Sequence, residues 1–378
     1  MRTAVAISEH PLATHAVGEC VGRILEIGGE APDLLAVFTT QAQLGALEDV
    51  VRATRQLLRP ATTIGAGLES VMADTREVER HGALSMFALW SDDPGGAPRA
   101  RSFRLRTSGS PEGPELLGAS GLRGATGTLL VLTDPFSTPS EALLDQLERV
   151  APLLQVVGGG ASAGRAPGGN VLVLDGQLHR DGAVAVLLPD TIPVHPIVAG
   201  STRPLGDTFT VTATEDELIT GLGGRSPIER LEELLVSLSP EERGVAVANL
   251  HLGRILDHDD PDGHVHVLQL LGIDRGRRGL AVAGQVEVGE SVRFELRSPD
   301  AATASLRDRI RGRRGTGGLV LSCTERGHSW FGEPDHDAAI LSEELGVPLG
   351  GGFFAGQIAP LAARPLGHRG SLVVALFG

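Results

Sequence analysis

Leu319-Val320-Leu321-Ser322 begins the stretch of sequence that decides the fold. An amphipathic segment from Asp335 to Leu345 follows, bounded by a proline and a glycine as is typical of a helix. Next come Gly350-Gly351-Gly352 and a second apolar run, Leu372-Val373-Val374-Ala375-Leu376. Because apolar runs of this length indicate buried strands, the stretch predicts a strand, a helix, a glycine-containing strand and a closing strand.

Two earlier parts of the chain repeat the order of this unit, and each copy is about 55 to 60 residues long. We therefore expect an α/β protein built from internally repeated strand-helix-strand-strand units, which form two lobes with twisted sheets. The first copy comprises Leu34–Phe38, Ala46–Leu58, Ile64–Gly67 and Leu84–Leu89. The second comprises Leu129–Leu132, Ser140–Leu154, Gly158–Gly160 and Val184–Leu187.

The copies suggest the domain organisation. We expect an N-terminal helical segment at residues 1–30, a first domain at 31–230 and a second domain at 231–378. Ser91–Leu116 is rich in Pro, Gly, Ser and Arg, which predicts a loop with an edge strand at Arg101–Arg106. Between the second and third copies, the patterns predict helices at Pro227–Leu238 and Ala301–Arg311, and strands at Thr208–Thr214, Val245–Leu250, Val265–Leu271, Leu280–Val288 and Val292–Leu296.

Composition excludes several classes of function. The 378 residues contain no lysine and no tyrosine, so all 33 basic side chains are arginines. A P-loop lysine, a kinase strand lysine, a Schiff-base lysine and a tyrosine-lysine reductase pair are therefore excluded. The formal net charge of −14 disfavours nucleic acid and anionic membranes as partners, because both are polyanions.

The chain is expected to be cytoplasmic. The apolar run before Glu9 is too short for the core of a secretory signal, and no apolar stretch is long enough to span a bilayer. Two cysteines, Cys20 and Cys323, suit a reducing compartment with free thiols. The stretch Asp257–His266 is dense in metal-ligand types, but its glycine does not fit an EF-hand and no cysteine lies near. We expect a polar turn there and no metal.

Cys323 closes the first strand of the third copy. Because the carboxyl ends of strands line ligand crevices in α/β sheets, its position predicts a ligand contact. Arg326 and His328 follow at once, and either could activate the thiol or pair with an anionic ligand. A buried, inert cysteine is the alternative.

Ser162 lies in a sequence with the spacing of a nucleophile elbow, Gly160-Ala161-Ser162-Ala163-Gly164. No helix start follows the serine, so a hydrolase is disfavoured. The glycines at 158–160 instead predict a backbone turn that comes close to a packed neighbour or to a bound ligand.

Four separated motifs resemble the FIST family, a family of intracellular signal-input domains, over most of the chain from about Pro32 to the end. The resemblance implies that 31–230 is a FIST N-terminal domain, that 231–378 is a FIST C-terminal domain, and that the chain is a sensory module more than an enzyme. The motifs are Leu132–Ser137, Gly158–Ser162, Gly200–Gly206 and a C-terminal group at Ser322–His328, Pro334–Asp337 and Gly350–Pro360.

Positions that match the family motifs are implied as ligand contacts: Asp134, Ser162, Arg203, Cys323, Arg326, His328 and Gln357. Two positions depart from the family pattern, since Glu325 replaces a common glycine and Gln357 replaces a usual acid. An amide exchanges only hydrogen bonds, so general-base catalysis at Gln357 is disfavoured. Arg203 suits an oxyanion ligand, with a surface ion pair as the alternative.

We therefore expect an intracellular sensor that binds a small polar metabolite, such as an amino acid, and that signals through a partner protein in trans. No kinase, cyclase or DNA-binding segment is recognised in the chain. Two alternatives stay open. One is a haem-binding gas sensor with an axial ligand from His195, His328, His336 or His368, and otherwise no cofactor is expected. The other is a cysteine-dependent enzyme that uses Cys323 with His328.

Overall fold

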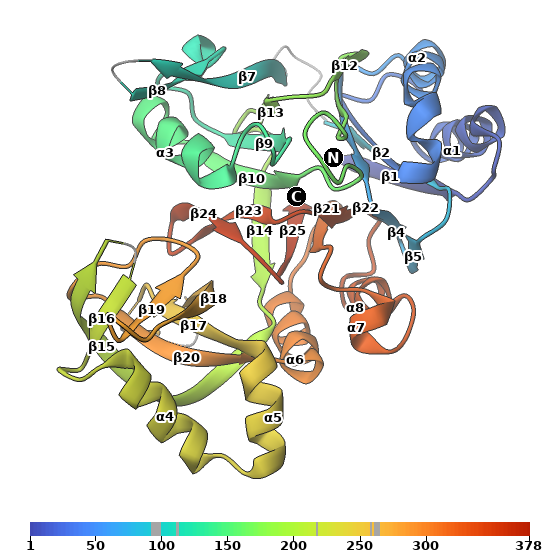
Figure 1. Ribbon diagram of the computed structural model, residues 1–378. Coiled ribbons are helices and arrows are strands. Elements are labelled where there is room, and N and C mark those ends of the chain that lie inside the picture. The colour runs from blue at the N-terminus through green and yellow to red at the C-terminus, as the bar shows by residue number, and fades with distance from the viewer. Residues whose placement is uncertain (92–99, 111–112, 217, 258, 261–264) are drawn as a thin grey trace. The chain divides into compact units, whose positions relative to one another are not determined.

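A computed structural model describes residues 1–91, 100–110, 113–216, 218–257, 259–260 and 265–378 (Figure 1). The fold is α/β with twisted sheets, which confirms the predicted class. The chain divides into two compact units. Unit 1 comprises Met1–Ala199, Leu306–Pro360 and Arg364–Gly378, and unit 2 comprises Gly200–Ser305 with Leu361–Ala363. This division differs from a single boundary near residue 230, because the third copy packs with the first two.

All three predicted copies form in unit 1. In each copy the first and second strands are parallel neighbours, and the closing strand returns antiparallel beside the first. The first copy is β2 (Leu34–Thr40), α2 (Leu47–Leu58), β3 (Thr62–Leu68) and β6 (Leu84–Trp90). The second is β9 (Thr128–Thr133), α3 (Ser140–Val150), β10 (Gln155–Gly160) and β13 (Ala183–Leu188). The third is β21 (Gly317–Cys323), α8 (His336–Leu345), β22 (Leu349–Phe354) and β25 (Leu372–Phe377).

A β-hairpin after the second strand of each copy crosses to the sheet of another copy. Hairpin β4 (Ser70–Ala73) and β5 (Arg76–Glu79) of the first copy pairs with β22 of the third. Hairpin β11 (Leu172–Leu174) and β12 (Gln177–His179) of the second pairs with β3 of the first. Hairpin β23 (Gln357–Leu361) and β24 (Arg364–His368) of the third pairs with β10 of the second. The exchange is cyclic, so each sheet contains strands from two copies.

The three sheets share one apolar core. Alternate residues of β2 show the division of faces, because Leu34, Ala36 and Phe38 enter the shared core while Leu35 and Val37 pack with α1 (Ala13–Gly28). The rings of Phe38 and Phe354, from two different sheets, lie edge to face at 5.6 Å. Helix α3 covers the outer face of its sheet, and α8 with the end of α6 (Pro299–Ile310) covers another.

Each sheet is extended beside its closing strand. Strand β1 (Arg2–Ser8) pairs with β6, so the N-terminal segment 1–30 holds a strand before its helix. Strand β14 (Val194–Ala199) pairs with β25. Strand β7 (Arg101–Ser110) pairs with β13 and with β8 (Gly113–Leu117), so a strand is confirmed at Arg101–Arg106. Its predicted edge position was wrong, because β8 pairs with its outer side and is itself the edge of the sheet. Residues 92–99 and 111–112 of that predicted loop lie outside the described residues.

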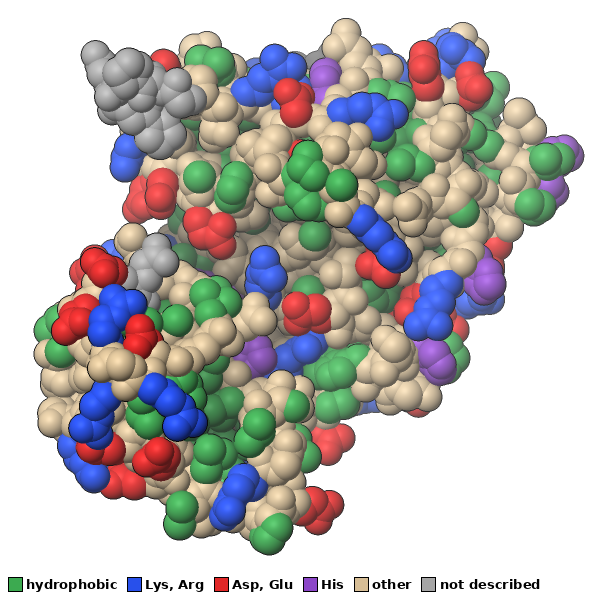
Figure 2. Space-filling view, viewed as in Figure 1, with side chains coloured by type: hydrophobic (Ala, Val, Ile, Leu, Met, Phe, Trp, Pro, Cys, Tyr) green, Lys and Arg blue, Asp and Glu red, His purple; other side chains and the backbone are tan. Residues whose placement is uncertain are grey.

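Unit 2 is a closed barrel with two helices. Its strands follow the order β15 (Thr202–Glu215), β16 (Leu218–Leu222), β19 (Gly279–Val282), β18 (Val265–Asp274), β17 (Leu250–Ile255) and β20 (Ser291–Arg297). Helices α4 (Pro227–Ser237) and α5 (Pro240–Asn249) complete it. Acidic and basic side chains are interspersed over the surface in Figure 2, in keeping with exposed ion pairs such as Arg278–Glu229.

The strand predicted at Val245–Leu250 was wrong, because helix α5 extends to Asn249. Ser239 and Glu242 form a capping box at the start of this helix, which fixes it as a helix despite the alternating valines. The turn predicted within Asp257–His266 lies partly outside the described residues, at 258 and 261–264. Short helices complete the chain at η1 (Gln41–Ala46), η2 (Ser120–Leu122) and α7 (His328–Phe331). None of the described helices combines the length and apolarity that a bilayer span requires.

Candidate functional site

Ser162 lies where the carboxyl ends of the parallel strands from all three copies meet. Its Oγ accepts a hydrogen bond from the Glu69 backbone N of the first copy at 2.8 Å and donates to the Phe353 carbonyl of the third copy at 2.6 Å. We call Glu69, Ser162, Phe353, Phe354 and Gln357 the junction. Ser162 was predicted as a ligand contact, and the structure shows its hydroxyl joining three copies.

Gln357 begins β23 beside Gly159 of β10. Its Nε2 donates to the Phe354 carbonyl at 3.3 Å, whereas its Oε1 has no hydrogen-bond partner within the described chain. The side chain is 1% exposed. Gly159 makes the close approach possible, because a Cβ there would lie 3.0 Å from the Gly356 carbonyl oxygen and from the Phe354 side chain. The junction therefore contains a buried acceptor that the protein leaves unpaired.

Cys323 is the last residue of β21, and Arg326 lies in the turn that follows. The Cys323 sulfur is 2% exposed and accepts a hydrogen bond from the Gly370 backbone N at 3.2 Å. Arg326 is also buried and forms a two-point ion pair with Asp337, with both N···O distances at 2.7 Å. Its guanidinium lies 5.2 Å from the ring centroid of Phe331, which belongs to α7. Arg326 is thus fully engaged by the protein.

A second buried carboxyl packs beside this ion pair. Glu77 of β5 accepts a hydrogen bond from the Ala338 backbone N at 2.8 Å, at the start of α8. Burial, with the nearby charge of Asp337, raises the pKa of Glu77 to about 8. Burial alone would raise the pKa of Asp337, but the charge and hydrogen bonds of Arg326 outweigh it and lower the pKa to about 2. At neutral pH, Asp337 is therefore ionised while Glu77 holds a proton.

Asp134 is 1% exposed and sits in a separate network at the end of β9. Its carboxylate accepts hydrogen bonds from the Ser137 hydroxyl at 2.6 Å and from Asn170 Nδ2 at 3.0 Å. The Asn170 carbonyl oxygen in turn accepts from the Gly164 backbone N at 2.7 Å. The network holds the loop between β10 and β11 against the end of β9.

The remaining predicted residues, Arg203 and His328, are both exposed. Arg203 is exposed on β15 of unit 2, and its charge lies near Glu242 of the same unit. His328 is exposed, and its backbone N donates to Glu79 Oε1 at 2.7 Å. No hydrogen bond joins Cys323 to His328 among the described residues.

The other histidines proposed as haem ligands differ in their surroundings. His195 is exposed on β14. His336 is buried, stacks on Phe331 with ring centroids 3.6 Å apart, and bonds to Asp337 through Nδ1 at 3.1 Å. His368 is buried with Nε2 3.1 Å from the Ala359 carbonyl oxygen. Two of the four predicted axial ligands therefore have a ring nitrogen engaged by the protein.

Sequence reasoning missed three side chains that build the site: Glu77, Asn170 and Asp337. Asp337 stands in a motif that was recognised. It lies 11 residues after Arg326, in the first turn of α8, so the short separation was a local signal for an ion pair between them. Glu77 contacts Ala338, 261 residues away in the chain, and Asn170 contacts Asp134 across 36 residues. No local pattern could have found those two.

Comparison with known proteins agrees with the resemblance read from the motifs. Residues 33–225 match the FIST N domain and residues 227–360 match the FIST C domain. The chain belongs to the FIST family. FIST domains are associated with sensing in signal transduction. An uncharacterized protein of Mycobacterium bovis is 33% identical over 388 residues, covering 100% of this chain and 99% of the relative. An uncharacterized protein of Mycobacterium tuberculosis is 31% identical over 388 residues, covering 100% of both.

Proposed function

We propose that this FIST protein is a cytoplasmic sensor that binds a small metabolite bearing an amino group, such as an amino acid, at the junction. The observation that carries the proposal is the unpaired Gln357 Oε1. A buried acceptor without a partner costs about 1–3 kcal/mol, which a ligand N–H donor would recover. The signal would pass to a partner protein in trans.

The junction has features that suit a binding site. Ala355 is exposed and Gly356 is partly exposed, and these two residues precede Gln357 at the surface of unit 1. The Gly356 carbonyl oxygen accepts a hydrogen bond from the Gly160 backbone N at 3.1 Å, so the turn at 355–356 bridges two copies. Because the junction joins all three copies, a ligand there would alter the contacts among them.

A thermal-shift screen of the purified full chain tests the proposal, with the common L-amino acids and their matching α-keto acids as probes. The keto acids keep the carboxylate but lack the N–H donor. An amino acid at about 100 times its dissociation constant stabilises the protein by roughly 2.7 kcal/mol, which raises the melting temperature by a few degrees. We expect a selective shift with an amino acid and none with its keto acid.

The variant Gln357→Met separates a ligand contact from a packing role. Methionine keeps the length of the side chain and removes both the unpaired acceptor and the 3.3 Å hydrogen bond to the Phe354 carbonyl. That carbonyl still accepts from the Thr324 and Gly356 backbone N, so the unliganded protein is expected to be about as stable as the wild type. The ligand shift should disappear. Arg203→Ala in unit 2 is the matched control and also tests its predicted role as a ligand contact. A shift that survives Gln357→Met, or no shift with any amino acid, would refute the proposal and favour a scaffold that acts only through protein contacts.

The two other hypotheses remain predictions with their own tests. Haem absorption by the purified protein after incubation with haem would support a gas sensor, and the four histidines described above are the residues to substitute. Labelling of Cys323 by a thiol reagent in the folded protein would support a cysteine-dependent enzyme. Its 2% exposure and its bond from Gly370 predict slow labelling.

A further inference from the structure

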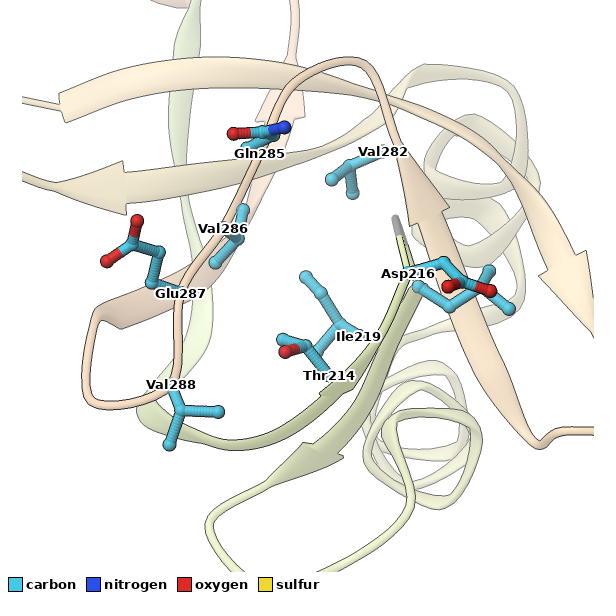
Figure 3. A pocket seen from close by; sticks show the side chains of 9 residues that line it. Thr214, Asp216, Ile219, Val282, Gln285, Val286, Glu287 and Val288 are labelled. Atoms are coloured by element: carbon cyan, nitrogen blue, oxygen red, sulfur yellow. The ribbon is translucent and has the colours of Figure 1, made fainter.

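Two of the cavities in the described chain differ in the chemistry of their lining. The cavity at the mouth of the barrel in unit 2 is lined in part by the polar residues Asp216, Gln285 and Glu287 (Figure 3). A second cavity, which we call the core cavity, lies within the apolar core that the three sheets of unit 1 share. Every residue of its lining is apolar or glycine, so a ligand there would be held by packing contacts alone.

Side chains from all three copies line the core cavity. Phe38, Leu132 and Leu321 hold equivalent places in the first strands of the copies. Each lies two residues before the position whose backbone N donates to the residue just ahead of the closing strand. The rest of the lining also comes from the first and second strands of the copies, and it includes Ile64 and Leu319. The core cavity therefore lies where the three sheets meet.

Exposed area inside the core marks the wall of this cavity. Leu130, Leu132, Leu319 and Leu321 are each 5% or 6% exposed, although all four belong to the shared core. Other residues of the same core, such as Val184, are 0% exposed. The exposed area of the four leucines therefore faces the cavity and not the outer surface, and these side chains lack packing partners on that side.

The core cavity has room for a very small molecule. The centre of a water-sized sphere can occupy about 20 Å³ of it, above the roughly 10–15 Å³ that one water molecule needs. Taken as a sphere, this space has a radius of about 1.7 Å, and adding the radius of water, about 1.4 Å, gives a void about 6 Å across. A buried water needs about two to four polar partners. The residues of this lining offer none, so we expect the cavity to stay dry.

An apolar void of this size matches an apolar molecule of two atoms. Such a molecule would contact the leucines that now face empty space, and it would gain dispersion attraction without losing strong hydrogen bonds to water. We propose that the core cavity binds a diatomic gas such as dioxygen. An amino acid would be too large, and it would lose its hydrogen bonds to water there. The core cavity and the junction therefore take different ligands, although Phe354 belongs to both.

Xenon and dioxygen are the probes, because xenon is an apolar atom that enters dry cavities and dioxygen is paramagnetic. The full chain is labelled with ¹³C at the isoleucine methyl groups and observed by NMR under each gas, with nitrogen as the diamagnetic reference for dioxygen. Ile64 lines the cavity, and Ile24, buried in the layer that packs α1, is the internal control. We expect a saturable shift of the Ile64 signal with xenon. Dioxygen should speed the relaxation of the Ile64 methyl relative to nitrogen several times more than that of Ile24.

Two matched variants locate the gas. Leu130→Phe extends a side chain into the cavity, whereas Leu129→Phe makes the same change at the preceding residue of β9, which packs with α3. Leu130→Phe should abolish the Ile64 response to both gases, and Leu129→Phe should keep it. Because the first variant fills a void and the second overpacks a filled layer, Leu129→Phe should lower the melting temperature more. Leu130→Met, which also reaches into the void, replaces Leu130→Phe if that variant does not fold.

Several outcomes would overturn the proposal. An Ile64 signal that xenon does not move would reject the site, and so would a response that Leu130→Phe or Leu130→Met leaves at its full size. An equal response at Ile24 would show general partition of gas into the protein. Xenon binding without any effect of dioxygen on Ile64 would reject a diatomic ligand. Gln357→Met should leave the xenon response unchanged, so failure here is distinguishable from failure of the amino acid site at the junction.

Discussion

The second and third copies stabilise the region just beyond their first strand with different polar side chains. Asp134 and Cys323 hold equivalent places, because the backbone N of each donates to the residue just before the closing strand, Gly182 or Ser371. In the second copy, neutral donors from Ser137 and Asn170 fill the space beyond the strand. In the third copy, a buried ion pair and a protonated Glu77 fill it. The same backbone arrangement thus forms with either set of polar side chains. The stability of the two copies should nevertheless respond differently to pH and to substitution.

We call the residues just beyond the first strand of the second and third copies the second-copy end and the third-copy end. The largest difference between them should appear when the ion pair of Arg326 and Asp337 is broken. Arg326→Met leaves Asp337 buried without a counter-charge, and such losses cost about 3–5 kcal/mol in the free energy of unfolding. Urea unfolding followed by tryptophan fluorescence measures this in unit 1, since both tryptophans, Trp90 and Trp330, belong to it. The double variant Arg326→Met with Asp337→Leu should recover much of the loss. A cost below about 1 kcal/mol for the single variant would contradict the description.

Glu77 should make the third-copy end sensitive to pH. Its pKa is raised in the folded protein, so between about pH 4.5 and 8 the folded chain holds a proton that the unfolded chain releases, and stability falls as pH rises. The slope approaches about 1.4 kcal/mol for each pH unit. Glu77→Gln keeps the acceptor for Ala338 N, and should be more stable than the wild type by about 3 kcal/mol at pH 7 but equal to it near pH 4.

The control for this prediction is Glu79→Gln on the same strand. Glu79 is only partly buried and accepts a hydrogen bond from the His328 backbone N. The charge of Glu79 is a minor cause of the raised pKa of Glu77, after burial and Asp337, so its substitution should leave most of the pH dependence in place. The assignment to Glu77 fails if Glu77→Gln retains the slope of the wild type between pH 5 and 8.

The second-copy end should depend on hydrogen bonds instead. Asn170→Ala removes the bridge between Asp134 and the Gly164 backbone N, and leaves both without that partner inside the protein. We expect a loss of about 2 kcal/mol in the free energy of unfolding. The loss should have the same size at pH 5 and pH 8, which urea titrations at both values would check. A loss that changes with pH would contradict the statement that only the third-copy end depends on pH.

The smallest expected effect concerns Ser162 in the junction. Ser162→Ala removes one hydrogen bond to Glu69 N and one to the Phe353 carbonyl, at a position that water partly reaches. The expected cost is about 1 kcal/mol. Ser329→Ala, on the exposed face of α7, is the control with no expected change. If Ser162→Ala costs no more than the control, the two hydrogen bonds of Ser162 do not stabilise the contact between the copies.

Much of the repeated architecture could be predicted from local patterns. The apolar runs and glycine clusters identified the two parallel strands, the helix and the closing strand of each copy, because buried strands require continuous apolar sequence, but they did not identify the hairpins. Sequence could not predict the exchange of hairpins, since β4, β11 and β23 are short and carry no signal for a distant partner. It also could not tell that Arg326 is neutralised internally, because burial of its partner Asp337 depends on β5 packing from the first copy.

In the candidate site, too, local features could be predicted from sequence and contacts between distant segments could not. Cys323 was found because its position at the carboxyl end of a strand is readable from sequence, whereas Asp134 was implied only by the family motif in which it stands. Their roles were not readable, since the roles depend on which donors arrive from other copies. Ser162 is the clearest case, because its partners lie 93 residues before it and 191 residues after it.

The cyclic hairpin exchange has a consequence for synthesis on the ribosome. Strand β4 ends at Ala73, but its partner in the sheet includes Gly350. At typical elongation rates of about 5–20 residues per second, the first copy waits on the order of half a minute before that partner is made. During this interval the hairpin β4–β5 has an unpaired edge, and chaperones that protect such edges would act on the nascent chain. The ring of copies therefore closes only when the last strands leave the ribosome.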